Sequence, residues 1–324
     1  MKRRSVLTAG AIGTVGLALS ACSGGSGGGS SADGEFDPGN RVTMIVPFSA
    51  GGGSDIAGRA IAAGLEEVTG ATITVENRVG GSGAVGYSGL TNAEGDGSML
   101  LASETALITL PIVQDVDFTY ESFTPIMKAG EDYNLVVVAA DSPFQSITDV
   151  IEAAKTEQLN AAVSGATGPD HIAWSLIEQE QGITLERVTF ESSSEVLAAL
   201  MGGHVQVAAS SPGELTGQLE SGDIRALCAL APERYEYDLL ADIPTGSEEG
   251  VEVTFAQWRG FIAPGGIDDA AKEYWIAKAK EYEQSDAYKE FIESNMLQPV
   301  TAYGDDFVEY LHEYAADVES VLGN

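Results

Sequence analysis

Three glycines followed by a serine and an aspartate, within SAGGGSD at residues 49–55, form the first segment whose residue types could bind a ligand. The segment joins an apolar stretch, RVTMIVPF, to an amphipathic one, DIAGRAIAAGLEEVTG. Glycines let backbone N–H groups approach a ligand closely, and the N-terminus of a helix attracts an anion. The segment therefore predicts an anion site, with Ser54 or Asp55 as the N-cap of the helix. Taken alone, it is equally compatible with a turn that binds nothing.

A second glycine motif, GSGAVG at residues 81–86, suggests a different ligand. It fits GxGxxG, follows the predicted strand TITVE, and precedes Glu104 at another strand end. These are parts of a dinucleotide fingerprint, so an NAD-dependent oxidoreductase that uses this turn is an alternative prediction. Residues 77–79 separate the strand from the first glycine, which loosens the tight turn that the fingerprint requires. A nucleoside triphosphate fits poorly, because no lysine lies between Met44 and Lys128 to complete a phosphate loop.

Small polar loops follow several other apolar runs of the sequence. They lie at 103–105, 164–168, 192–194 and 210–211. In open α/β sheets, ligands bind beyond the carboxyl ends of the strands, so these loops are expected to meet the glycine turn in one crevice. The candidate ligand-binding residues in them are Ser103, Thr105, Ser164, Gly165, Thr167, Ser192 and Ser210.

Residue types for catalysis or metal binding are sparse. The three histidines, at 171, 204 and 312, show neither HExxH nor any other metal-ligand spacing, and Gly-x-Ser-x-Gly does not occur. We therefore predict no catalytic residue, no metal and no cofactor. With 16 basic against 49 acidic residues and a net charge of −33, the chain also lacks the basic surface that a nucleic-acid partner requires. The same charge opposes an anionic ligand unless salt screens it.

The first residues have the pattern of an export signal. Lys2, Arg3 and Arg4 precede an apolar segment that ends in Leu-Ser-Ala-Cys, which resembles a lipobox with Cys22 as the lipidated residue. The twin arginines leave Tat and Sec export open. We assign 1–22 to a lipoprotein signal peptide and 23–40 to a flexible Gly/Ser-rich tether. These segments predict an extracytoplasmic protein that is lipid-anchored to the outer face of the cell membrane.

From residue 41 onward, short apolar runs alternate with amphipathic stretches, which predicts an α/β fold. The predicted strands are 41–48, 71–77, 98–103, 134–139, 160–163, 188–191, 205–210 and 224–230. The last part of the chain predicts three helices, at 268–284, 286–295 and 304–322. Apolar side chains at helical spacing in the last of them, from Phe307 to Leu322, indicate core packing. Cys228 lies in an apolar run and is expected to be a buried thiol.

Several motifs occur in an order that resembles the substrate-binding receptors of tripartite tricarboxylate transporters, also called the Bug family. The run VPFSAGGGSD, the strand that ends in VENR and the glycine turn after it resemble the opening of those receptors. The runs FESSSEVLAALMGGHVQVAASSPGEL, SGDIRALCAL and PTGSEEGVEVTFAQWRGFIAPGGI resemble later parts of the family pattern. The likeness extends from about residue 41 to residue 322, and it identifies GSGAVG as the family's second strand–helix turn.

The resemblance implies a two-lobed Venus-flytrap fold of the type II periplasmic-binding-protein kind, in which each lobe is a mixed sheet flanked by helices. Lobe 1 would hold 41–133 and 258–324, and lobe 2 would hold 134–257, including the crossover strands. The family grips a carboxylate of its ligand largely with main-chain groups from two loops. These correspond here to residues 48–55 and 164–168. By that likeness, the further ligand-binding residues are Phe48, Ala50, Gly51, Gly52, Ser54 and Asp55. Arg259, beside Trp258, is the best remaining cation for a second carboxylate of the ligand, and a surface ion pair is the alternative.

The sequence departs from the family pattern at three places. Gly53 stands where a proline is common, Glu191 and Ser192 replace a Lys-Gly pair, and Glu104 adds a negative charge. The last two changes favour a monocarboxylate or an amino-bearing ligand over a tricarboxylate.

The function that the resemblance implies is that of a receptor, not an enzyme. It would capture a small organic carboxylate, whether a di- or tricarboxylate, an aromatic acid or an amino acid, and deliver it to membrane permease subunits. We expect a monomer. A sensor that presents the same ligand to a signalling receptor is an alternative that the sequence leaves open.

Overall fold

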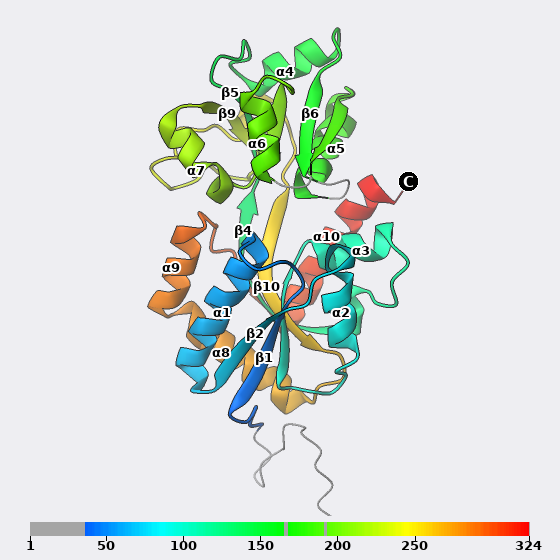
Figure 1. Cartoon of the computed structure of the whole chain (residues 1–324), viewed down its shortest axis with the longest axis vertical. Helices are drawn as coiled ribbons and strands as arrows, with labels where there is room; N and C mark the ends of the chain where they lie inside the picture. The colour runs from blue at the N-terminus through cyan, green and yellow to red at the C-terminus, as the bar shows by residue number, and fades with distance from the viewer. Residues whose placement is uncertain (1–35, 165–167, 191–192, 324) are drawn as a thin grey trace, which may run out of the picture.

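The structure, a computed structural model, describes residues 36–164, 168–190 and 193–323. Two sheets flanked by helices form two lobes, one above the other (Figure 1). This confirms the predicted two-lobed α/β fold. Cys22 and most of the predicted tether lie outside the described residues. Within the described part of the chain, no helix combines the length and the apolar character that a membrane span needs.

Lobe 1 is built on a six-stranded mixed sheet in the order β11-β4-β10-β3-β1-β2. Strands β1, β2 and β3 run parallel to one another, whereas β10 runs antiparallel to both β3 and β4. The strands are β1 (Arg41–Val46), β2 (Thr72–Asn77), β3 (Met99–Glu104), β4 (Phe123–Tyr133), β10 (Ala256–Pro264) and β11 (Ala302–Tyr303).

Lobe 2 is built on a five-stranded sheet in the order β7-β6-β8-β5-β9. Strand β5 is antiparallel to β8 and β9, while β6 is parallel to β7 and β8. The strands are β5 (Leu135–Ala139), β6 (Asn160–Ser164), β7 (Glu186–Phe190), β8 (Val207–Ser210) and β9 (Ile224–Ala229). Cys228, on β9, is fully buried, as the apolar run around it predicts.

Helices cover both sheets (Figure 1). In lobe 1 they are α1 (Gly53–Thr69), α2 (Ala84–Thr91), α3 (Ala106–Val113), α8 (Asp269–Glu283), α9 (Asp286–Ser294) and α10 (Gly304–Leu322). In lobe 2 they are α4 (Ile147–Ala154), α5 (Pro169–Gln181), α6 (Ser193–Met201) and α7 (Pro212–Ser221). Short 3-10 turns occupy Gly81–Gly83, Tyr120–Ser122 and Ser247–Glu249. The three predicted C-terminal helices are confirmed as α8, α9 and α10.

The apolar stripe of α10 is confirmed as core. Phe307, Leu311 and Val318 are fully buried, and Leu322 is partly buried against the same cluster. Burial of such side chains contributes about 1.5–3 kcal/mol each. The helix contacts α3 and β4 in lobe 1 and α5 in lobe 2, so it lies along the junction of the two lobes.

Strand β4, which links the lobes, was not predicted from the sequence. Its segment, FTPIMKAGEDY, contains a proline, a glycine and three charged residues, so it lacks the apolar pattern of a buried strand. Lys128 and Glu131 are nevertheless buried, because they pair with each other at 2.6 Å. Lys128 also lies 3.7 Å from the ring centre of Tyr310, on α10. Tertiary pairing here overrides a polar local sequence.

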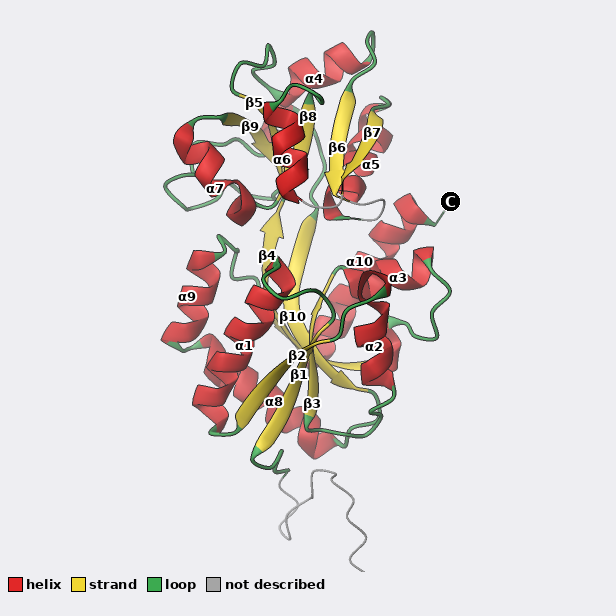
Figure 2. Ribbon diagram, viewed as in Figure 1, coloured by secondary structure: helices red, strands yellow, loops and turns green. Residues whose placement is uncertain are grey.

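Two strands carry the chain between the lobes (Figure 2). A single residue, Asn134, separates β4 of the lower sheet from β5 of the upper one. On the return, Phe255 donates from its N–H to the carbonyl of Leu230 at 3.1 Å, and β10 then enters the lower sheet. Residues at these crossings therefore face the space between the lobes.

Candidate functional site

A cleft between the lobes is the candidate site. It has a smaller chamber of about 160 Å³, named the inner chamber here, and a larger one of about 730 Å³, named the outer chamber. The outer value falls in the range of roughly 300–1,000 Å³ that small-molecule sites occupy. Ser54 and Arg259 of lobe 1 and Ser164 and Glu214 of lobe 2 line both chambers, so the two chambers form one cleft.

The glycine turn forms one wall of this cleft. Gly51, Gly52 and Gly53 line the outer chamber, and the helix α1 begins at Gly53 with Gly52 as its N-cap. The prediction of Ser54 or Asp55 as the N-cap was wrong, because the N-cap lies two to three residues earlier, at Gly52. The N–H groups of Gly53 and Ser54 have no hydrogen-bond partner among the residues that the structure describes. They are exposed donors at the positive end of a helix dipole.

Asp55 holds the glycine turn in shape from behind the cleft. Its carboxylate accepts from Arg59 Nε at 2.9 Å, from Asn77 Nδ2 at 2.8 Å and from the N–H of Gly51 at 2.9 Å. The hydrogen bond from Arg59 is the main cause that lowers the pKa of Asp55 to about 2. The backbone of Gly51 has a φ of +84°, which side-chain-bearing residues rarely adopt. The turn is therefore preorganised by a glycine and a buried carboxylate.

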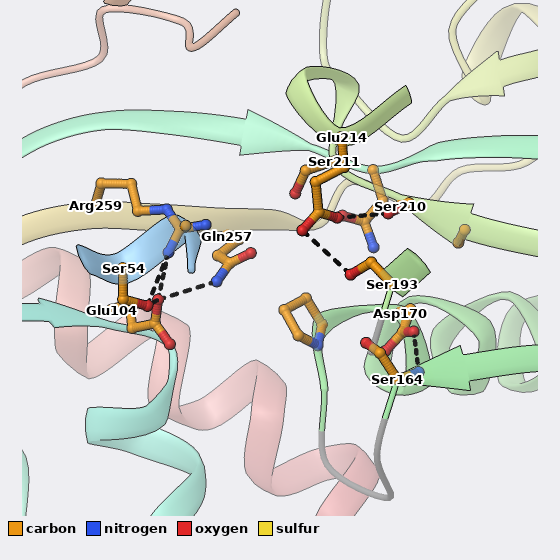
Figure 3. A pocket seen from close by; sticks show the side chains of 14 residues that line it. Ser54, Glu104, Ser164, Asp170, Ser193, Ser210, Ser211, Glu214, Gln257 and Arg259 are labelled. Carbon is orange, nitrogen blue, oxygen red and sulfur yellow. Dashed lines mark hydrogen bonds and ion pairs between the residues drawn. The ribbon is translucent and has the colours of Figure 1, made fainter. Parts of the chain in front are cut away.

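Arg259, on β10, is the central cation of the cleft (Figure 3). Its Nη1 pairs with Glu104 Oε2, which also accepts from Ser54 Oγ at 2.6 Å and from Gln257 Nε2 at 3.3 Å. Burial opposes the charge of the guanidinium, but the charges of Glu104 and Asp132 outweigh it and raise the pKa of Arg259 above its usual value. The second terminal nitrogen, Nη2, lies 3.4 Å from the position that a Cβ would take at Gly53. It is thus close to the start of α1.

Asp132, at the end of β4, is the second carboxylate beside Arg259. Its Oδ2 lies 3.7 Å from Arg259 Nε, and its Oδ1 accepts from Ser211 Oγ at 2.6 Å. Burial raises the pKa of Asp132 to about 6, since it outweighs the attraction of Arg259 and the hydrogen bond from Ser211. Asp132 therefore carries a charge at neutral pH at a cost to stability.

Lobe 2 contributes carboxylates from the first turns of its helices. Glu214 of α7 accepts from Ser210 Oγ at 2.7 Å and from Ser193 Oγ at 3.1 Å. Asp170 of α5 accepts from the N–H groups of Ser164 and His171. Burial nevertheless raises the pKa of Asp170 above its ordinary value. The helix ends on this side of the cleft thus face acidic side chains of their own, which offset their positive dipoles.

The structure brings part of the predicted site together. Seven predicted residues line the cleft, namely Phe48, Gly51, Gly52, Ser54, Ser164, Ser210 and Arg259. Four do not line either chamber, namely Ala50, Asp55, Ser103 and Thr105. Gly165, Thr167 and Ser192 lie outside the described residues. A binding role for the predicted residues stays a prediction.

Ser103 and Thr105 have partners inside lobe 1 instead. Ser103 Oγ lies 3.1 Å from the hydroxyl of Tyr87, and Thr105 Oγ1 lies 3.0 Å from that of Tyr314. Glu104, between them, turns the other way and lines the inner chamber. Alternation of side chains along the end of a strand explains why neighbours separate in this manner.

The sequence analysis missed several cleft residues. Asp132 and Asn134 lie at the β4 crossing, which was not recognised as a strand end, and Glu214 lies just beyond the serine pair 210–211. A signal for Glu214 was present, because an acidic residue in the first turn of a helix after a strand can reach the same edge of the sheet.

The glycines of the GSGAVG motif have a packing role. A Cβ at Gly83 would lie 3.2 Å from the ring of Phe48, and one at Gly86 would lie 2.6 Å from Pro47. The motif forms a 3-10 turn, Gly81–Gly83, before the short helix α2, in place of a tight strand-to-helix turn. It packs against Pro47 and Phe48, which lie between β1 and the glycine turn.

Comparisons with known proteins agree with this architecture. Over 275 residues the chain is 24% identical to the protein BugT of Bordetella pertussis, a match that covers 83% of this chain and 84% of that protein. A TctC solute binding protein from Polaromonas, solved without ligand, superposes with a TM-score of 0.77 at 23% identity, covering 88% of this chain and 98% of that one. The Rhodopseudomonas palustris protein Rpa4515, solved with adipate, gives a TM-score of 0.77 at 24% identity, covering 89% and 99%.

The structural likeness at this identity establishes a shared fold. The family is established by sequence, since the family model for a "Tripartite tricarboxylate transporter family receptor" matches residues 57–322. That match begins within α1 and runs to the end of the last helix, so it includes every strand of the two sheets except β1. The chain belongs to the family of tripartite tricarboxylate transporter receptors, which are extracytoplasmic solute-binding proteins.

Proposed function

We propose that this receptor captures a small organic carboxylate in the cleft between its lobes and hands it to the membrane permease subunits of a tripartite tricarboxylate-type transporter. It performs no chemistry on the ligand. The observation that carries the proposal is the group of free donors on the lobe 1 wall, where α1 begins beside Arg259. Adipate in the Rhodopseudomonas palustris neighbour supports a carboxylate as the ligand class.

The carboxylate binds between the start of α1 and the guanidinium of Arg259. The N–H groups of Gly53 and Ser54 donate to its oxygens, and Arg259 Nη2 supplies a charge-assisted bond. Such fixed dipoles favour an anion even in a chain whose net charge is −33. Closure of the lobes over the ligand then brings the lobe 2 wall, which includes Ser164, against it.

The receptor is held at the membrane by a lipid on Cys22, after removal of the preceding signal peptide, and it acts as a monomer. The lipobox-like ending Leu-Ser-Ala-Cys and the tether to residue 40 support the anchor. Mass spectrometry of the membrane-extracted protein tests the lipid on Cys22, and light scattering tests the monomer.

Thermal-shift and calorimetric titrations of the full chain test the ligand class. The panel holds di- and tricarboxylates, aromatic acids, amino acids and NAD(H). We expect one carboxylate class to raise the unfolding temperature, because a ligand at 100 times its Kd stabilises the native state by about 2.7 kcal/mol. A shift with NAD(H) alone would instead make the GSGAVG turn the site and overturn the proposal.

A double variant tests the location of the site. Gly52→Val with Ser54→Ala is expected to abolish carboxylate binding and to leave the fold intact, since Gly52 has an extended backbone and an added Cβ would meet only the Ser49 carbonyl oxygen, at an ordinary contact distance of 3.5 Å. The matched control is Gly217→Val on α7, outside the cleft, where an added Cβ meets nothing within 4 Å. Unchanged affinity in the double variant would disprove the assignment of the glycine turn.

An experiment in cells distinguishes a role in transport from a role in sensing. A strain that lacks the receptor should lose uptake of the carboxylate. If uptake continues and only a transcriptional response to the carboxylate disappears, the protein is a sensor that presents its ligand to a signalling receptor.

A further inference from the structure

Glu214 lines the inner chamber and, among the residues that the structure describes, has no cation within ion-pair distance; the charge of Arg259 acts on it only from farther away. Within the same residues its carboxylate accepts hydrogen bonds from two hydroxyl groups, those of Ser210 and Ser193. The side chain is exposed, so a ligand can reach it. Two hydroxyl donors leave lone pairs of the carboxylate free, and its full charge is not neutralised.

Asn134 provides a second, independent indication of a missing partner. The residue is only 1% exposed and lines the same chamber as Glu214. Within the described residues, neither Oδ1 nor Nδ2 of its amide has a hydrogen-bond partner. Buried amides are almost always satisfied, because an unpaired one destabilises the fold.

The position of Asn134 is set by the chain crossing. Its carbonyl accepts from the N–H of Leu230 at 2.9 Å, and β4 and β5 hold it on either side. The backbone therefore fixes Asn134 at the wall of the chamber, with its unpartnered amide beside it.

The inner chamber is lined mainly by polar side chains on both walls. In Figure 3, Arg259, Ser54 and Gln257 lie on one side of the chamber, while Ser210, Ser211 and Glu214 lie on the other. The first wall offers N–H donors at the start of α1 and the guanidinium. The second wall offers the carboxylate of Glu214, with the amide of Asn134 in the same chamber. The carboxylate of Glu104 already accepts from Arg259 Nη1, Ser54 Oγ and Gln257 Nε2. It therefore leaves the N–H groups at the start of α1 and Arg259 Nη2 available to a ligand.

We propose that the ligand carries an ammonium group as well as its carboxylate, and that Glu214 and the Oδ1 atom of Asn134 accept the N–H donors of this group in the inner chamber. This inference rests on the proposed carboxylate function and narrows the ligand to amino carboxylates. A primary ammonium carries a positive charge and three N–H donors. The charge is attracted to the carboxylate of Glu214, and the donors can bond both to that carboxylate and to the neutral Oδ1 of Asn134. The small inner chamber takes one end of the molecule, and the carboxylate end remains at the start of α1.

Matched pairs of probes that differ only in the amino group test the inference. We would titrate the full chain with aspartate and succinate, glutamate and glutarate, and 4-aminobutyrate and butyrate. The amino member of at least one pair should bind about tenfold more tightly than its partner, the size expected of one charge-assisted hydrogen bond. Glu214→Gln should weaken binding of that amino member by about tenfold and leave the other member within about twofold.

Glu220→Gln serves as the control variant. It removes the same charge from an exposed position of the same helix, outside the cleft, and should change neither affinity. If the amino-free member of every pair binds as tightly as its partner, or if Glu214→Gln improves its binding, the ammonium assignment is wrong and the carboxylate receptor stands. If no member of any pair binds and no other carboxylate does, the proposed function fails, and this inference fails with it.

Discussion

Arg259 illustrates how a single cation can serve a cleft with several carboxylates. Its Nη1 neutralises Glu104 and its Nε faces Asp132, while Nη2 is directed toward the start of α1. A planar guanidinium can divide its donors among partners in this manner, whereas a lysine ammonium acts as a point charge. The fixed acidic partners hold the guanidinium in place, so that less side-chain entropy is lost when a ligand binds.

Asn134→Leu should separate stability from ligand binding. Leucine has nearly the shape of asparagine but no polar atoms, and the amide of Asn134 makes no hydrogen bond within the described residues. We therefore expect the free energy of unfolding to stay the same or to rise by up to about 1–3 kcal/mol, because a buried unsatisfied amide is removed. Urea unfolding at neutral pH measures this change.

The affinity of the same variant for an amino carboxylate should fall, which calorimetry measures. A loss of stability greater than about 1 kcal/mol would instead show that the amide supports the fold.

Asp132→Asn should stabilise the protein at neutral pH and not in acid. Burial raises the pKa of Asp132 from 3.8 to about 6, so the folded protein holds this proton more tightly than the unfolded chain. The contribution of the residue to stability is then complete below about pH 4 and is lost as the pH rises to about 6. The lost free energy is roughly 2–3 kcal/mol.

Asparagine keeps the acceptor for Ser211 and does not ionise. Urea unfolding of the wild type and the variant at pH 4 and pH 7.5 should therefore give similar stabilities in acid and a more stable variant at the higher pH. A variant that is less stable at pH 7.5 would mean that the ion pair with Arg259 outweighs the burial of Asp132.

At the scale of elements, the sequence predicts the helix α1 after a glycine turn, but not the residue that caps it. Strand, glycine turn and helix follow from the pattern of residues 41–70, whereas the N-cap at Gly52 does not. Ser54 and Asp55 are strong capping residues by type. In the structure Ser54 donates to Glu104, which lies far away in the sequence. Asp55 accepts from Arg59, on the next turn of the helix, and from Asn77, at the end of β2. Only the tertiary contacts decide between these partners.

Gly53→Pro should stabilise α1. Gly53 is the first residue of the helix, where proline is favoured, and its N–H has no partner within the described residues. Gly52, at φ −82° and ψ 168°, already has the extended conformation that a residue before proline adopts. The unfolded chain also loses freedom, so the free energy of unfolding should rise by about 0.4–1 kcal/mol.

Thermal and urea unfolding measure the change, and Gly53→Ala is the control that keeps the N–H. A destabilised proline variant with a normal alanine variant would show that the N–H of Gly53 has a structural partner.

At the scale of the whole molecule, the two-lobed fold was predictable because several motifs occur in the family's order. The junction between the lobes was harder to predict from the sequence. The crossing at β4 depends on buried charges that pair only after folding, such as Lys128 with Glu131, and on a buried tyrosine, Tyr133, which donates to Glu131 at 2.5 Å. A local pattern of polar residues cannot reveal such pairs. The same crossing places Asp132 and Asn134 in the cleft, so the missed strand and the missed site residues have one cause.

Relative movement of the lobes can be tested where they approach each other beside the cleft. A Cβ at Gly213, on α7 of lobe 2, would lie 3.0 Å from the carbonyl oxygen and 3.7 Å from the Cα of Asn295, which follows α9 of lobe 1. A disulfide requires Cβ atoms about 3.5–4.5 Å apart. The two segments come close enough for Gly213→Cys with Asn295→Cys to be tried as a pair, and thiol titration of the oxidised variant shows whether the bridge forms. The native thiol of Cys228 is buried, and burial raises its pKa to about 12, which keeps it out of the exchange.

Oxidation of this double variant should slow both the association and the dissociation of a carboxylate ligand, and a reductant should restore both rates. The physical reason is that a ligand held by both walls can enter and leave only when the walls separate. Stopped-flow fluorescence measures the rates, with each single cysteine variant as its control. If the bridge forms and both rates stay as in the wild type, the lobes need not separate for exchange, and the cleft would bind its ligand as a preformed site with a permanent entrance.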